Sequence, residues 1–358
     1  MQIGILGSGD YATALAYRFS NSHNVVNWYI RRPEDRERLL STGHHKHFPD
    51  YQFNMNYIKV MSNVASVVQE SDIIILAIPS AYIAQELISI VYTDDSVDIP
   101  SKSWVVMSKG LVTYPNLSSC DIITEYLQVV LGDRWSDIFV LSGPSHAEEI
   151  ITGRFSALGC AQLSNNKPNC SGVDIHGIFS SINIHTSNEL IDIKVLQFSS
   201  ILKNVYGIGA GIVDSLNVGD NTKALFSMIC INELSRFLSD LYPADLYPVY
   251  LYPYCNCTDR YRIYTMGDIL VTMYSNHSRN YRLGRNIVEG NIPSSSEKCQ
   301  VEGFNTITTL HQCASTESGI NNLRELPVVR FVSDCIYKAS GNKEEIDGMF
   351  HKLLYSHL

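Results

Sequence analysis

The chain has 358 residues, of which 27 are basic and 36 acidic, giving a formal net charge of −9. This length allows two domains with cores of their own, and the acidic balance argues against nucleic acid or an anionic membrane as the main partner. No apolar stretch approaches the roughly 20 residues that span a bilayer, and the nine cysteines lack paired spacing, which favours a reducing compartment over a disulfide framework.

The chain opens with a short apolar strand, 3–6, and a glycine-rich turn into a helix over 13–18. In the pattern Gly7-Ser8-Gly9-x-x-Ala12, the first glycine permits a sharp turn and the second lets backbone approach a pyrophosphate. The helix N-terminus then offers N–H groups to the phosphates. The flanking strand and helix favour a dinucleotide-binding loop over an ordinary glycine turn.

A second strand, 25–30, ends at Arg31-Arg32. Dinucleotide-binding folds usually have a carboxylate here that binds the ribose hydroxyls, whereas two guanidiniums would bind a 2′-phosphate. The pair therefore favours NADP over NAD. The alternative is a solvated basic loop beside acidic neighbours, namely Glu34, Asp35 and Glu37.

Two clusters raise the question of a metal site. His44, His45 and His47 lie in a polar segment, and we expect solvated surface there instead of a metal site. Cys255-Asn256-Cys257 has no second cysteine pair at zinc-ligand spacing. We expect no metal.

Alternating strands and helices continue to about residue 188. A helix is expected at 82–91, and strands at 72–78, 104–107, 138–141, 156–163 and 182–186. The pattern is typical of a doubly wound α/β (Rossmann) domain, which we assign to residues 1–190.

Polar residues follow three of these strands, where ligands of open α/β sheets bind. The turns are Pro79-Ser80, Ser108-Lys109-Gly110 and Ser142-Gly143-Pro144-Ser145. Lys109 would bring a cation, while Gly143 and Ser145 would bring backbone and hydroxyl donors. The alternative for each is a simple strand-to-loop turn.

Helical periodicity dominates after residue 189, with long segments at 195–216, 222–241 and 303–313. We therefore expect a mostly helical second domain over residues 191–358. Between its helices, the Tyr-Pro repeats of 242–254 cannot continue a helix. We expect an ordered loop there, with its tyrosines on the surface or on a second subunit.

Lys203 is the leading catalytic candidate, because it and Asp214 are the only charged residues from 195 to 216. Burial disfavours the ammonium form and lowers its pKa, as a general acid/base near neutral pH requires. The alternative is a lysine that reaches solvent from the helix surface. Gly207, Ala210 and Gly211 indicate close packing and favour the buried site.

Two later motifs are also candidates. Gly267-Asp268 is expected to open a helix, with Asp268 either its cap or a site residue. In Ser278-Arg279-Asn280, Arg279 can bind a phosphate through two parallel N–H bonds. By itself this triplet is equally compatible with a polar turn.

Taken in order, these segments resemble the soluble NAD(P)-dependent glycerol-3-phosphate dehydrogenases over nearly the whole chain. The matching motifs include Gly7–Ala16, Ile78-Pro79-Ser80, Lys109-Gly110-Leu111, Leu141–Glu149, Leu202–Val205, Gly209–Asp214, Gly219–Ala224, Gly267-Asp268, Ser278–Asn280 and Val301-Glu302-Gly303. The Tyr-Pro segment departs from the family pattern.

The resemblance implies a Rossmann domain followed by a helical domain, in a homodimer that reduces dihydroxyacetone phosphate reversibly to sn-glycerol 3-phosphate for phospholipid synthesis. It implies that Lys203 exchanges the proton at the substrate C2 oxygen. The implied substrate-binding residues are Lys109, Gly143, Ser145, Lys203, Asp268, Ser278, Arg279 and Asn280. The implied cofactor-binding residues are Asp10, Tyr11, Arg31, Ala147, Arg279 and Glu302, beside the loop residues and Arg32.

Two other functions stay open from the residues alone: a related dehydrogenase of the 3-hydroxyacid type, and a non-catalytic NAD(P)-binding regulator. Because the chain starts directly with a strand, we expect no signal peptide and a cytoplasmic location. The ending Ser356-His357-Leu358 is a near-variant of the peroxisomal Ser-Lys-Leu signal, so a peroxisome-like organelle is the alternative.

Overall fold

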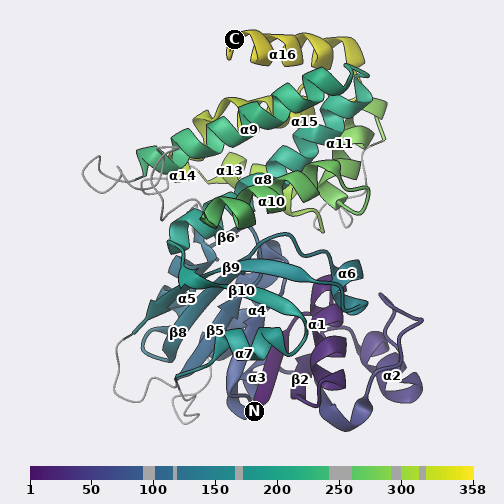
Figure 1. Ribbon diagram of the computed structural model, residues 1–358, viewed down its shortest axis with the longest axis vertical. Coiled ribbons are helices and arrows are strands. Elements are labelled where there is room, and N and C mark those ends of the chain that lie inside the picture. Colours follow the sequence, from purple (N-terminus) through teal and green to yellow (C-terminus); the bar gives the residue numbers. More distant parts are fainter. Residues whose placement is uncertain (92–100, 116–118, 166–171, 242–259, 292–299, 314–319) are drawn as a thin grey trace. The chain divides into compact units, whose positions relative to one another are not determined.

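The computed structural model describes residues 1–91, 101–115, 119–165, 172–241, 260–291, 300–313 and 320–358. They form two compact units (Figure 1): unit 1 comprises residues 1–108 and 123–196, and unit 2 comprises 109–122 and 197–358. Residues 109–122 thus group with the C-terminal half of the chain, although they precede much of unit 1 in sequence.

Unit 1 is built on one eight-stranded sheet in the order β10-β9-β8-β5-β4-β1-β2-β3. All neighbouring strands are parallel except β8 and β9. The strands are β1 (Gln2–Leu6), β2 (Val25–Tyr29), β3 (Ile58–Met61), β4 (Ile73–Leu76), β5 (Lys102–Val106), β8 (Trp135–Ser142), β9 (Ser156–Ser164) and β10 (Ile184–Leu190). The order around β1 confirms the predicted doubly wound α/β fold.

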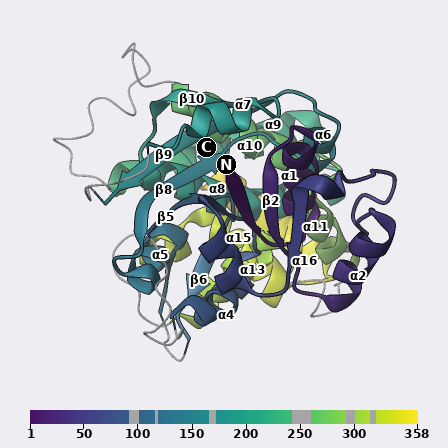
Figure 2. The same cartoon turned by 90° about the horizontal axis from the view of Figure 1, so that it is seen from below.

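Helices cover both faces of this sheet. Figure 2 shows α1, α6 and α7 on one face and α4 and α5 on the other. The helices of unit 1 are α1 (Asp10–Asn21), α2 (Pro33–Thr42), α3 (Val64–Glu70), α4 (Ser80–Val91), α5 (Ile123–Leu131), α6 (Ala147–Ile151) and α7 (Ile175–Ser180), with a 3-10 turn η1 (Met55–Tyr57). On the α1 face, a continuous core includes Ile3, Ile5, Phe19, Trp28 and Phe179. Burial of these apolar side chains is the main force that holds the helices to the sheet.

Some predicted bounds differ from those observed. β4 ends at Leu76, two residues before the predicted end, and β10 runs over Ile184–Leu190 instead of 182–186. The hydrophobic run at 72–78 continues past the strand because Ile78 is buried without belonging to the ladder. Apolar composition therefore located these strands but not their ends.

Unit 2 is mainly helical, as predicted, and also contains a small antiparallel hairpin of β6 (Leu111–Thr113) and β7 (Cys120–Ile122). Its helices include α8 (Ile193–Ser215), which starts within unit 1. The other helices among the described residues of this unit are α9 (Asp220–Asp240), α10 (Arg260–Tyr274), α11 (Arg279–Glu289), α13 (Glu302–Gln312), α14 (Ile320–Glu325), α15 (Pro327–Tyr337) and α16 (Lys343–Tyr355).

Close helix packing in unit 2 depends on glycines of α8 and α11. A Cβ atom at Gly211 would lie 2.0 Å from the Tyr281 carbonyl oxygen, and one at Gly284 would lie 2.0 Å from that of Ile208. No larger residue fits at either position without separating the two helices. The close packing predicted from the small residues of α8 is confirmed.

The prediction that Gly267-Asp268 opens a helix is wrong, because α10 begins at Arg260 and these residues lie in its interior. Glycine and aspartate are poor formers of helix interiors, but packing can outweigh such local preferences.

The Tyr-Pro segment 242–254 and the Cys255-Asn256-Cys257 pair lie outside the described residues.

Three further features bear on the predicted class of protein. No helix in the described ranges is long and apolar enough to cross a membrane, and these ranges contain no cluster of three or more metal-binding side chains. The described cysteines are free and buried: Cys120, Cys160, Cys230, Cys313 and Cys335.

Candidate functional site

The loop between β1 and α1 fits a dinucleotide pyrophosphate. Gly7 has φ +126°, and a Cβ atom there would lie 2.4 Å from the Ala77 carbonyl oxygen, so only glycine is accommodated. The Cβ position of Gly9 has nothing within 4 Å. Gly9 is also the N-cap of α1, and no side chain caps this helix. The loop therefore has the open glycine backbone and uncapped helix start that an anionic group requires.

Two side chains that sequence reasoning did not assign to the site hold this loop. The indole Nε1 of Trp28 donates to the Gly7 carbonyl at 2.7 Å. His47 pairs through Nδ1 with Asp10, in the first turn of α1, at 2.5 Å. These contacts fix the turn and the orientation of Asp10, so the surroundings of the loop extend to residues 45–47.

The prediction that the three histidines are solvated surface is wrong for His45. Its ring is fully buried and lies 5.2 Å from the Trp28 ring, while Nδ1 is 3.3 Å from the Thr13 hydroxyl. Burial lowers the pKa of His45 to about 4, so the ring is neutral at physiological pH. His45 thus packs against α1 and β2 as part of the core.

At the tip of β2, the predicted arginine pair is divided. Arg32 is the exposed N-cap residue of α2. The Nη1 of Arg31 lies 3.3 Å from Oε1 of Glu86, a residue of α4. The residues that follow β2 directly, Arg31 and Arg32, include no carboxylate, but Glu86 of α4 reaches this tip and contacts Tyr29 and Arg31.

The β8–α6 turn brings together two residues from different motifs. The Tyr11 hydroxyl donates to Ser145 Oγ at 3.2 Å, and Ser145 Oγ donates to the Gly143 carbonyl at 3.0 Å. Gly143 is required by packing, since a Cβ atom there would lie 2.3 Å from the Ala157 carbonyl oxygen. Ala147 begins α6 and is buried in the core. A predicted cofactor residue, Tyr11, thus orients a predicted substrate residue, Ser145.

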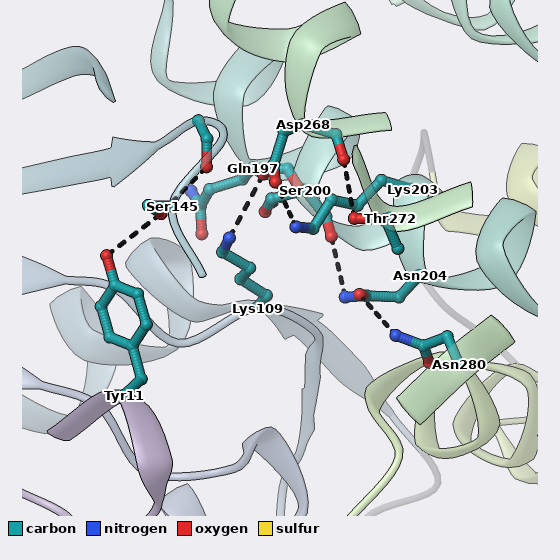
Figure 3. A network of polar contacts seen from close by, with 11 residues as sticks. Tyr11, Lys109, Ser145, Gln197, Ser200, Lys203, Asn204, Asp268, Thr272 and Asn280 are labelled. Carbon is teal, nitrogen blue, oxygen red and sulfur yellow. Dashed lines mark hydrogen bonds and ion pairs between the residues drawn. The ribbon is translucent and has the colours of Figure 1, made fainter. Parts of the chain in front are cut away.

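In unit 2, two lysines share one buried carboxylate (Figure 3). Lys203 of α8 binds Oδ1 of Asp268, and Lys109 binds Oδ2 at 3.2 Å. Lys203 and Asp268 are buried, whereas Lys109 is partly exposed. When both lysines are protonated, the two ammonium groups and one carboxylate give this cluster a net positive charge, which suits an anionic substrate.

The pKa shifts of this cluster follow from its burial. Desolvation lowers the pKa of Lys203, the charge of Asp268 opposes this shift and the nearby charge of Lys109 adds to it, so that the pKa is about 7. Burial raises the pKa of Asp268, but attraction to the two lysines outweighs it and keeps the pKa below its ordinary value. Lys203 can therefore exchange a proton near neutral pH beside a carboxylate that stays ionised.

Asn280 belongs to a polar network that joins three helices. Its Nδ2 donates to Oδ1 of Asn204 at 2.9 Å, and its Oδ1 accepts from the Gly303 N–H at 2.9 Å. Asn204 in turn donates to the Ser200 carbonyl at 3.0 Å. Figure 3 shows Asn204 beside Lys203 on α8. The network fixes α8, α11 and α13 around the lysine cluster. Asn204 lies in the Leu202–Val205 motif, but no role for its side chain was predicted from the sequence.

The other two residues of the Ser278–Asn280 triplet have different roles: Ser278 caps a helix, and Arg279 places a positive charge at its start. Ser278 is the N-cap of α11, where its hydroxyl accepts from the Tyr281 N–H at 3.3 Å. Arg279 reaches the Gln300 carbonyl at 3.5 Å. Burial and the nearby Arg282 lower the Arg279 pKa, whereas Glu302, the first residue of α13, raises it. Arg279 and Glu302 are thus within electrostatic range of one another.

Two family models match the chain. The model of the NAD-dependent glycerol-3-phosphate dehydrogenase N-terminus matches residues 2–168, and that of the C-terminus matches residues 192–347. Together they include the glycine loop, both lysines, Asp268 and Arg279.

Similar proteins agree with these models. A glycerol-3-phosphate dehydrogenase (NAD(P)+) of Brachyspira hyodysenteriae is 30% identical over 295 residues, covering 81% of this chain and 79% of that protein. One from Thermoanaerobacter sp. strain X514 is 26% identical, covering 97% and 96%. The fold matches a crystal structure of glycerol-3-phosphate dehydrogenase from Coxiella burnetii with a TM-score of 0.72 at 20% identity, covering 99% of this chain and 98% of that one.

Proposed function

Since this chain belongs to the NAD-dependent glycerol-3-phosphate dehydrogenase family, and is an oxidoreductase that uses NAD or NADP, we propose that Lys203 is its proton donor and acceptor. The reaction interconverts sn-glycerol 3-phosphate and dihydroxyacetone phosphate, and it supplies glycerol 3-phosphate for phospholipid synthesis. The observation that carries the proposal is the buried Lys203 ammonium held by Asp268.

When bound, NADH or NADPH would supply the hydride that C2 of dihydroxyacetone phosphate accepts. Lys203 gives its proton to the C2 oxygen as negative charge develops there, which yields the secondary alcohol and leaves a neutral amine. A pKa near 7 suits both directions, since the amine can regain a proton from solvent or take one from the alcohol. Asp268 holds the ammonium group in one orientation. Its negative charge also favours the protonated form of Lys203, so that the proton stays on the lysine until the C2 oxygen accepts it.

Two cations are proposed to contact the substrate: one binds its phosphate, and the other stabilises the negative charge that develops on the C2 oxygen. Arg279 is the candidate for the phosphate, because a guanidinium can donate two parallel bonds to its oxygens. Lys109 pairs with the same carboxylate as Lys203, that of Asp268, and adds positive charge beside the proposed position of the substrate C2 oxygen. Asn280 and Ser278 hold the start of α11, from which Arg279 projects. Gly143 and Ser145 are proposed as further substrate contacts.

The cofactor is proposed to bind at Gly7, Ser8, Gly9, Asp10, Tyr11, Arg31, Arg32, Ala147, Arg279 and Glu302. The open backbone at Gly9 and the uncapped start of α1 support the pyrophosphate position. We assign cofactor binding to a domain of residues 1–190 and catalysis to a domain of residues 191–358.

The test is oxidation of NADH or NADPH by the purified chain with dihydroxyacetone phosphate as substrate. We expect turnover with this substrate and little with a 3-keto carboxylic acid of similar size, because the site offers several cations for a phosphate dianion. Preference for the keto acid would favour the 3-hydroxyacid class. Cofactor binding without turnover on either substrate would favour a regulator.

A homodimer is supported by exposed apolar side chains on α9 and α10. Ile263, Leu270 and Tyr274 recur at helical spacing along α10, and each is more than 40% exposed, as is Met228 of α9. Such a stripe is typical of a protein interface. Light scattering should give twice the chain mass for the wild type and a smaller value for Ile263→Asp/Leu270→Asp.

We further propose a cytoplasmic location, consistent with the free cysteines.

A further inference from the structure

Glu86 makes two contacts at the end of the strand that is assigned to the cofactor ribose. Its Oε2 accepts from the Tyr29 hydroxyl at 2.5 Å, and its Oε1 lies 3.3 Å from Nη1 of Arg31. The Arg31 guanidinium also lies over the Tyr82 ring, 4.8 Å from its centroid. Glu86 and Tyr82 both belong to α4, so this helix supplies the carboxylate that β2 lacks.

The contacts hold Glu86 more firmly than Arg31. The Glu86 side chain is 9% exposed, whereas that of Arg31 is 44% exposed. The Tyr29 ring is buried against the sheet, and its hydroxyl fixes one carboxylate oxygen. The carboxylate is thus a rigid, mostly buried negative charge beside a guanidinium that still reaches solvent.

This arrangement changes what the arginine offers to a ligand. A 2′-phosphate that approaches Arg31 must compete with Glu86 for the same guanidinium, and it meets the negative charge of that carboxylate. A ribose with two free hydroxyls carries no such charge, and a carboxylate is a good acceptor for hydroxyl donors. The nearby cation Arg32 is exposed and is the N-cap residue of α2.

We propose that Glu86 determines the cofactor preference of this enzyme, by engaging Arg31 and disfavouring NADPH relative to NADH. The inference rests on the proposed cofactor site and concerns a residue that no motif of the chain identifies. It predicts that the NADP preference expected from Arg31-Arg32 is suppressed in the wild type and emerges when the Glu86 charge is removed.

The experiment is a fluorescence titration of NADPH and of NADH without substrate, on the wild type and on Glu86→Gln. Glutamine keeps an acceptor for the Tyr29 hydroxyl but removes the charge. We expect the ratio of the two dissociation constants to shift towards NADPH by about tenfold or more. The matched control is Glu34→Gln, an exposed glutamate in the first turn of α2, which should change the ratio less than about twofold.

A double-mutant cycle tests whether Glu86 acts through Arg31. In an Arg31→Ala background, Glu86→Gln should shift the ratio much less than in the wild type. An unchanged ratio in a folded Glu86→Gln protein, or an equal shift in Glu34→Gln, would overturn the inference. The proposed function fails separately, if the wild type binds neither cofactor or does not reduce dihydroxyacetone phosphate.

Discussion

Lys203 and Asp268 form an ion pair whose side chains are only 8% and 4% exposed, between helices α8 and α10. One turn further along each helix, a Cβ atom at Gly207 would lie 2.9 Å from Cγ2 of Thr272. Because Gly207 has no side chain, α8 and α10 can approach closely enough for Lys203 and Asp268 to pair. Removing water from both charges makes their interaction strong and lowers the Lys203 pKa.

Replacing Lys203 with alanine should reduce kcat by about 10²–10⁴-fold or more, because the general acid is lost. Cofactor affinity, measured by fluorescence titration, should stay close to the wild-type value. Lys194→Ala is the control, since Lys194 lies on the same helix but is half exposed and pairs with Glu125. A Lys203→Ala enzyme with most of its wild-type rate would remove this lysine from the mechanism.

The rate of ketone reduction should depend on pH through the Lys203 ammonium. Reduction needs the protonated form, whose population falls as pH rises through a pKa of about 7, so kcat should decline on the alkaline side. Oxidation of the alcohol needs the neutral amine and should decline on the acidic side. Both profiles are measured with saturating substrate and cofactor.

Asp268→Asn should displace the alkaline limb of the reduction profile to lower pH, by about one unit or more. The substitution removes the negative charge that raises the Lys203 pKa against the effect of burial, and it leaves two neighbouring ammonium groups. A thermal unfolding scan shows whether the variant folds, because an unpaired buried charge also destabilises. A limb that stays at the wild-type pH in a folded variant contradicts the assigned coupling.

Arg279→Ala should raise KM for dihydroxyacetone phosphate much more than KM for unphosphorylated dihydroxyacetone. A lost charge-assisted hydrogen bond to phosphate costs about 1.5–3 kcal/mol, or roughly 10–150-fold in affinity. Arg282→Ala, on the same helix, serves as the control. Equal losses with both substrates would assign Arg279 to the protein structure or the cofactor instead.

Much of the fold follows from local patterns in the sequence. Apolar runs located β1, β2, β4, β5 and β8, and the glycine spacing at Gly7 and Gly9 identified the turn into α1. The isolated charge of Lys203 in an apolar helix predicted its burial. Each of these features is encoded by a pattern within a window of about 20 residues, so composition and periodicity are sufficient to find it.

The remaining features depend on contacts between distant segments. Glu86 is 55 positions from Arg31 in sequence, and only the packing of α4 beside β2 brings them together. His45 lies in a polar segment, but its ring is buried 5.2 Å from the Trp28 ring. The two lysines are joined by Asp268, whose place in the middle of α10 is contrary to its local preference. Tertiary packing outweighs local propensity at each of these positions.

A buried carboxylate outside the lysine cluster should make stability depend on pH. Glu233 of α9 is 4% exposed and accepts the Val328 N–H at the start of α15 at 2.6 Å. Burial raises its pKa from 4.5 to about 7, although the Val328 amide opposes the shift. Between these two values the unfolded chain has lost the proton that the folded protein keeps, so stability falls as pH rises through this interval.

Glu233→Gln should therefore be more stable than the wild type at pH 8, by about 1–3 kcal/mol, with little difference at pH 5. The amide oxygen can still accept from Val328, and the cost of burying a charge is absent. Urea unfolding of both proteins at the two pH values measures the difference, in which the contributions of other titrating groups cancel. Glu289→Gln, an exposed glutamate of the same unit, should show no such growth with pH. A difference that is constant from pH 5 to pH 8 would mean that Glu233 keeps an ordinary pKa in the folded protein.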